Sequence, residues 1–133
     1  MKVLSIREPY ATLIKEEIKT IETRSWKTNF RGDIIIHSCK GKYSINDKIK
    51  NIVDKNKLQY GKMICIAKIV DCILIDEEFV NKLKEENYTN YLCGDYNLGR
   101  YAWILKDIRE IKTPIEISGQ LGLWNYEGDF KWK

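Results

Sequence analysis

The sequence has little of several features that define whole classes of protein. Its 133 residues include only 2 prolines and 8 glycines, too few for a collagen-like or low-complexity chain, and 44% hydrophobic residues, too many for a disordered one. Apolar runs are far shorter than the roughly 20 residues of a membrane-spanning helix. The segment Met1–Glu8 has no signal-peptide core. We therefore expect one folded domain over residues 1–133, cytoplasmic and without a membrane partner. A monomer is favoured, and the sequence leaves the oligomeric state open.

Residues that bind metals are also scarce. The only histidine is His37, and the four cysteines, Cys39, Cys65, Cys72 and Cys93, form no Cys-x-x-Cys pair. Because zinc sites are usually built from closely spaced pairs, we expect neither a metal nor a cofactor. Cys65 and Cys72 lie in apolar, strand-like sequence, where a reduced thiol serves as a small core side chain.

The charge is distributed unevenly along the chain. Residues 1–66 carry 14 basic and 7 acidic side chains, a net charge of +7, whereas residues 67–133 carry 9 and 12, a net charge of −3. A basic half attracts polyanions over about one Debye length, ~8–10 Å. The pattern is compatible with a nucleic-acid partner, and equally with solubility alone.

Periodicity predicts a strand-dominated, mixed α+β fold. Expected strands are residues 3–6, 20–26, 33–38, 63–75 with a bend near Asp71, 100–105 continued at 108–115 across a turn or bulge, and an edge strand at 124–126. Expected helices are 9–17, 44–55 with Ser44 as its N-cap, and a short one capped by Asp76. Residues 88–99 are expected to form a loop. This order favours a small β-barrel of about five or six strands, with two or three helices packed around it, over an alternating α/β fold.

The densest polar cluster beside apolar sequence is Lys19, Glu22 and Arg24. On a strand, Glu22 and Arg24 share one face about 6.5–7 Å apart, and Lys19 at the preceding junction can turn toward them. Two cations around a carboxylate suit a phosphate, a nucleobase edge or a carbonyl. The alternative is a solvated strand face with an ion pair worth less than about 1 kcal/mol.

Two motifs resemble the ASCH (activating signal cointegrator homology) domain of the PUA-like β-barrels. The segment Leu4–Ile14 is similar to the family's opening, LS-x-x-x-P-(W/Y)-A-x-x-I, and residues 17–24 to its signature, G-x-K-x-x-E-x-R. Later segments at 32–37, 61–72, 101–103 and 114–124 also resemble the family. One position departs: Glu17 replaces the glycine, which would adopt a left-handed helix end at little cost.

The resemblance implies binding of RNA or a modified nucleotide or nucleoside in a cleft lined by the signature residues. It also offers an enzymatic alternative, with Lys19 and Glu22 as candidate catalytic residues. One bacterial group resembling this domain hydrolyses N4-acetylcytidine with a Lys, a Thr and a Glu. Its Lys matches Lys19, its Thr falls at Glu22, and Glu85 or Glu86 are loose candidates for its Glu. Another group is reported as ribonucleases, and a protein-interaction module is the third alternative.

Further residues could contact a ligand. Trp26 is expected on the face of Glu22 and Arg24 and is the best stacking candidate, with Tyr10 a second one. His37 ends a buried strand and is a candidate for the cleft. The loop 95–100 could lend Tyr96 or Arg100. Trp103 and Trp124 are expected in the core. A solvated face, or a track for phosphates, is expected from Lys40, Lys42, Lys48, Lys50, Lys55 and Lys57.

Overall fold

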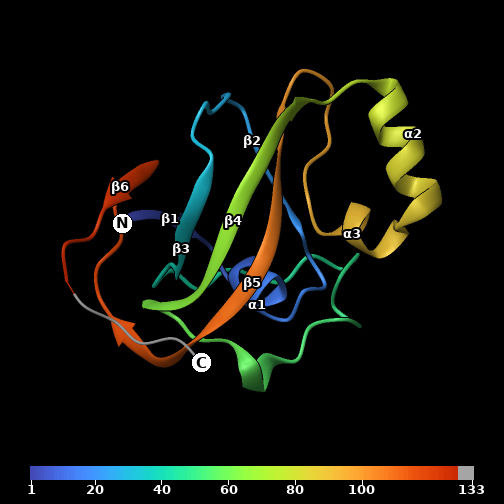
Figure 1. Cartoon of the computed structure of the whole chain (residues 1–133). Helices are drawn as coiled ribbons and strands as arrows, with labels where there is room; N and C mark the ends of the chain where they lie inside the picture. The colour runs from blue at the N-terminus through green and yellow to red at the C-terminus, as the bar shows by residue number, and fades with distance from the viewer. Residues whose placement is uncertain (129–133) are drawn as a thin grey trace.

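A computed structural model, which describes residues 1–128, shows one curled sheet with one helix packed against its middle strands and two further helices at one side (Figure 1). Within these residues six strands pair in the order β2-β5-β4-β3-β1-β6. Their bounds are β1 Lys2–Ile6, β2 Ile21–Arg24, β3 Gly32–Ser38, β4 Lys62–Leu74, β5 Tyr101–Glu116 and β6 Leu123–Asn125. Pairing is antiparallel except between β1 and β3. The predicted strand-dominated, PUA-like architecture is confirmed.

β3 and the first half of β4 are buried on both of their faces. Ile34 and Ile36 pack into one cluster with Ile14 of α1 (Tyr10–Lys15), while Ile35 packs into another with Trp124. Consecutive strand side chains point to opposite faces, so the run of isoleucines serves two cores at once. One edge strand of this sheet, β2, carries the charged cluster.

The junction between α1 and β2 is tight. The Leu13 carbonyl accepts hydrogen bonds from the amides of Ile18 and Lys19, both at 3.0 Å. Glu17 sits in the left-handed region with φ of 62°. Glycine, which the family has at this position, adopts such a conformation at little cost. Glutamate has a Cβ that disfavours it, and adopts it here nevertheless.

The predicted helix over 44–55 is wrong. This segment forms turns and a short 3-10 helix, η1 (Lys55–Lys57). The Asn46 side chain accepts from the Lys48 amide at 3.0 Å, and the Ile49 amide bonds the Asn46 carbonyl at the same distance. Asn side chains that bond nearby amides compete with the helix. The apolar side chains of the segment, with Ile49 fully buried, are nevertheless held against Leu13.

The connection from β4 to β5 holds two helices where the sequence predicted one helix and a loop. α2 (Glu77–Glu86) is capped by Asp76, as predicted, whose side chain accepts from the Phe79 amide at 2.8 Å. α3 (Tyr88–Leu92) occupies the predicted loop, and Asn87 is its cap. The two helices lie together at one side of the sheet (Figure 1).

The remaining predictions differ from the structure mainly at their bounds. β5 is one continuous strand across the predicted turn or bulge, and the bulge alternative is the one observed: Asp107 has a positive φ, and the register against β4 shifts there. β2 ends at Arg24, two residues before the predicted end, because the chain bends at Ser25 and Trp26. The edge strand near 124–126 is confirmed as β6. None of the helices in residues 1–128 is long and apolar enough to cross a membrane.

Candidate functional site

A polar cavity of about 520 Å³ opens beside the edge strand β2. Its walls come from four separate parts of the chain: the turn between β1 and α1, the stretch from Lys19 to Arg24, the loop after α3, and the 46–48 turn. Lys19, Glu22 and Arg24 all line it. The three signature side chains, expected to meet at one cleft, do lie together.

Lys19 is the most deeply placed of the three, with 1% of the residue exposed. Its Nζ donates to the Cys93 carbonyl at 2.7 Å and lies 3.5 Å from Oε1 of Glu22. The amine is also 5.6 Å from the centre of the Tyr10 ring. Burial lowers the pKa of Lys19 from its ordinary value, and the Glu22 carboxylate opposes that shift. An ammonium has three donors, so one remains for a ligand.

Glu22 joins the two cations. Its Oε2 accepts from Nε of Arg24 at 3.0 Å and lies 2.9 Å from Nη2 of the same guanidinium. Arg24 Nη2 also donates to the carbonyl of Ser5 at 3.0 Å, which ties β2 to the end of β1. The Arg24 side chain stays 23% exposed, so the guanidinium is fixed in direction and still accessible. Fixed, charge-assisted donors of this kind suit oxyanions and base edges.

The loop after α3 closes the opposite wall. The Asp95 amide donates to Oγ1 of Thr23 at 3.1 Å, and Arg100 donates to the carbonyls of Thr23 and Asp95 at 3.3 and 3.2 Å. At Gly94 a Cβ would lie 2.7 Å from the Tyr96 ring and 3.3 Å from the Thr23 methyl group. A glycine is therefore required for the loop to approach β2 so closely.

Comparison with known proteins identifies the family to which this chain belongs. The model of the ASCH domain family matches residues 4–118. The chain belongs to the ASCH domain family. Solved structures of ASCH from Zymomonas mobilis share the fold at 20% identity and a TM-score of 0.54, covering 86% of this chain and 72% of that one. A tyrosine-to-phenylalanine mutant of the same protein gives 0.54 with 86% and 74%, and a serine-to-alanine mutant 0.52 with 87% and 73%, both at 20% identity. No curated protein matches the chain.

In this ASCH domain two of the other predicted ligand residues also line the cavity. Tyr10 contributes to the wall from α1, and Arg100 from the position just before β5. Arg7, which the sequence analysis did not single out, lies 6.0 Å from the centre of the Tyr10 ring and 4.8 Å from that of Tyr43. The Arg7 guanidinium and the Lys19 amine thus both lie near the Tyr10 ring.

Trp26 and His37 lie outside this cavity. Because β2 ends at Arg24, Trp26 leaves the face of the cluster and packs edge-on against Trp103, with 4.7 Å between ring centres. Trp103 itself is fully buried, as predicted. His37 is 1% exposed and is bonded to Ser5 and Ile117. The expectation for Trp26 arose from a face assignment that the bend after Arg24 does not permit, whereas His37 lies near the end of the buried strand β3, as expected.

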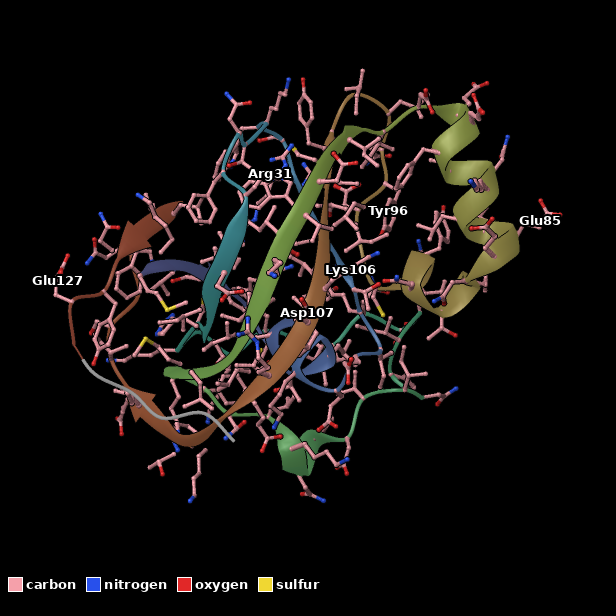
Figure 2. The ribbon with its side chains drawn as sticks, viewed as in Figure 1. Arg31, Glu85, Tyr96, Lys106, Asp107 and Glu127 are labelled. Atoms are coloured by element: carbon pink, nitrogen blue, oxygen red, sulfur yellow. The ribbon has the colours of Figure 1, made fainter. Side chains whose placement is uncertain are left out.

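The residues that a hydrolase of the acetylcytidine type would need are not all assembled. Figure 2 shows Glu85 on α2 pointing away from the rest of the domain, and both Glu85 and Glu86 are exposed. The Thr20 hydroxyl accepts from the Asn90 side chain at 2.8 Å, and that of Thr23 accepts from the Asp95 amide. Residues 1–128 contain no group of three or more His, Cys, Asp or Glu side chains placed to hold a metal ion.

Several lining residues gave no signal in the sequence. Cys93 contributes its backbone carbonyl, which any residue could supply, and Asn46 comes from the segment predicted as a helix. Lys48, from the same segment, is expected from the sequence only as part of a solvated face or a phosphate track. Tyr96, a candidate from the 95–100 loop, is instead buried in a stack with Tyr91 and Phe79, between the sheet and α2 (Figure 2). Its hydroxyl has no hydrogen-bond partner within residues 1–128, and burial raises its pKa.

Proposed function

We propose that this ASCH domain binds RNA, or a modified nucleotide or nucleoside, in the cavity beside β2. The observation that carries the proposal is the fixed array of Lys19, Glu22 and Arg24 on the wall of a polar cavity of about 520 Å³. That volume lies within the range of small-molecule sites, roughly 300–1,000 Å³. The expected cytoplasmic location and monomeric state remain expectations.

The three side chains have different roles in this proposal. Arg24 presents a guanidinium held at Nε and Nη2, so its exposed edge is available to a phosphate or carbonyl oxygen. Lys19, the most deeply buried of the three, supplies positive charge and one remaining hydrogen-bond donor. Glu22 orients both cations and can accept from the exocyclic amino group of a base.

Two further features support a nucleotide over an uncharged ligand. Lys48 and Arg100 add positive charge at the rim, against a single lining carboxylate there, Asp95. Arg100 is only partly neutralised by Asp95, at 3.5 Å. The Tyr10 ring supplies an aromatic surface in the same wall, and base–aromatic stacking is worth about 1–3 kcal/mol.

A hydrolytic function is the second candidate, and one observation favours it. The pKa of the Lys19 amine is lowered by burial, which increases its basic, uncharged fraction near neutral pH. Against it, Glu22 occupies the position of the threonine that the acetylcytidine hydrolases use. In this candidate Lys19 is the base or charge stabiliser, with Glu22 as its partner.

Equilibrium binding with simultaneous detection of product separates the candidates. Nucleosides, N4-acetylcytidine, nucleoside monophosphates and short RNAs are titrated against the wild type, Arg24→Gln and Arg31→Gln. Arg31 is the matched control, since it bonds the carbonyls of Thr28 and Phe30 and lines no part of the cavity. We expect saturable binding without product, weakened by about 10-fold or more in Arg24→Gln, as for the loss of a charge-assisted hydrogen bond.

Three results would count against that expectation. Product from any substrate, above a heat-killed control and lost in Lys19→Arg, would put the enzyme first, because an arginine cannot act as a base. Equal affinity in Arg24→Gln and the wild type would remove the cavity from the binding site. Failure of every ligand to bind would contradict the proposed function and leave the protein-interaction alternative.

A further inference from the structure

A second cavity of about 450 Å³ adjoins the first. The two share Ser5 and Arg24 in their walls, so the Arg24 guanidinium stands at the boundary between them. The other walls of the second cavity come from the end of β3 and from residues 118–122, the segment that leads into β6.

The 117–122 segment is held against β3 by a chain of partly buried hydrogen bonds. Trp124 Nε1 donates to Oγ of Ser5 at 3.1 Å, and the same oxygen lies 3.1 Å from Nδ1 of His37. Ser5 therefore directs its own proton to Nδ1, and the His37 Nε2–H donates to the Ile117 carbonyl at 2.8 Å. A Cβ at Gly119 would lie 2.7 Å from both His37 Cε1 and Ser5 Oγ, so only glycine allows this close approach.

The two cavities differ in chemistry. The first is lined by the charged side chains of the array and of the loop after α3, which are Lys19, Glu22, Arg24, Asp95 and Arg100. The second is lined by the neutral imidazole of His37, the Cys39 thiol, glycine backbone and Leu121. Leu121 is 97% exposed, an unusual state for a leucine that nothing in residues 1–128 covers. Lys40 adds one cation at the rim, where its Nζ donates to Ser118 at 3.3 Å.

Arg24 offers a donor at the boundary. Its Nε and Nη2 are engaged by Glu22 and Ser5, and Nη1 makes no hydrogen bond to any of residues 1–128. In a nucleic-acid strand a phosphate links two neighbouring nucleosides, each of which carries a flat base. The Arg24 guanidinium, whose Nη1 is free within residues 1–128, lies at the boundary of a polar and an apolar cavity and is placed to contact such a phosphate with one base in each cavity.

We propose that the second cavity receives the base of the nucleotide next to the one held by Lys19 and Glu22, with the linking phosphate on Arg24. The ligand is then a single-stranded RNA segment of at least two nucleotides, and not a free nucleoside. This inference rests on the proposed function, because it requires a nucleotide in the first cavity.

The test compares nucleoside monophosphates with the dinucleotides that contain them, by equilibrium binding to the intact chain. In the wild type we expect dinucleotides to bind more tightly by about 5-fold or more, the gain from burying roughly 40 Å² or more of base surface at about 25 cal/mol per Å². Leu121→Asp places a carboxylate at the second cavity and should remove most of this advantage. Leu74→Asp is the matched control, since Leu74 is 52% exposed on β4 and lines neither cavity.

Each outcome is decisive. Equal affinities for monophosphates and dinucleotides in the wild type would overturn the second subsite while leaving the proposed function intact. Retention of the full advantage in Leu121→Asp, and in Lys40→Gln as a second variant, would show that the added nucleotide lies elsewhere. Failure of both ligand classes to bind would overturn the proposed function and this inference together.

Discussion

Lys19 and Cys93 are joined by a buried hydrogen bond between positions 74 residues apart, with 2.7 Å from the Lys19 amine to the Cys93 carbonyl. The bond connects the approach to β2 with the loop after α3, which are the two facing walls of the cavity. The same amine pairs with Glu22. The Lys19 ammonium therefore links two distant parts of the chain at this edge of the sheet, and it also pairs with the carboxylate of the site.

Replacement of Lys19 by methionine should lower the free energy of unfolding by about 1–3 kcal/mol, because the Cys93 carbonyl loses its buried donor. Lys106→Met is the control, since Lys106 is exposed on β5. Denaturant unfolding monitored by tryptophan fluorescence measures both. Unchanged stability in Lys19→Met would show that the buried bond contributes nothing net.

Replacement of Glu17 by glycine should stabilise the domain, by up to about 1 kcal/mol. Its φ of 62° costs a residue with a Cβ about 1–2 kcal/mol, and the greater freedom of glycine in the unfolded chain offsets part of that gain. The neighbouring Glu16 has φ of −82°, so Glu16→Gly should destabilise by about 0.5–1 kcal/mol. Thermal unfolding of the pair measures the contrast, and a loss of stability in both variants would contradict it.

The contribution of His37 to stability should depend on pH. Burial lowers the pKa of folded His37 below its ordinary value of 6.5, although the bond to the Ile117 carbonyl opposes the shift. The unfolded chain then binds more protons than the folded one as pH falls from 6.5, so stability is full above that pH and declines below it. Wild-type and His37→Gln unfolding free energies between about pH 5 and 8 measure this. A difference that is constant over that range would contradict the prediction.

The dependence of RNA affinity on salt concentration should show how many phosphates contact the residues at the rim of the cavity. For single strands the logarithm of affinity falls with the logarithm of salt concentration by about 0.7 per contact. Lys48 lines the cavity, so Lys48→Ala should reduce the slope for a short RNA by a fraction up to about 0.7, whereas Lys106→Ala should not. Filter or fluorescence binding at several salt concentrations measures the slope. A salt-independent affinity would indicate a small neutral ligand.

Most of the fold could be predicted from the sequence, because the strands carry strong apolar periodicity. The isoleucines of β3 predicted burial on both faces, and Asp76 predicted the start of α2. The segment 44–55 could not be predicted in the same way, because side-chain bonds such as that of Asn46 replace the helical ones. α3 lies in a stretch of Tyr and Asn without apolar periodicity, and its cap Asn87 is the only local signal.

The charged array of the site was also predictable, and its surroundings were not. Glu22 and Arg24 are fixed by their spacing on β2, and Lys19 by its place at the junction just before that strand, both of which local sequence determines. Trp26 was misplaced because the strand ends two residues earlier than alternation indicates. The Cys93 carbonyl has no side-chain signature, since a backbone acceptor is placed by the tertiary fold.

The most direct test of nucleotide binding beside β2 is a backbone-amide NMR titration of the intact chain with a nucleoside monophosphate and with a short single-stranded RNA. We expect shifts that concentrate at residues 19–24 and 93–95 and in the turn between β1 and α1, and that are lost in Arg24→Gln. Shifts confined to another part of the domain, or no shifts at concentrations that saturate binding of either ligand, would contradict it.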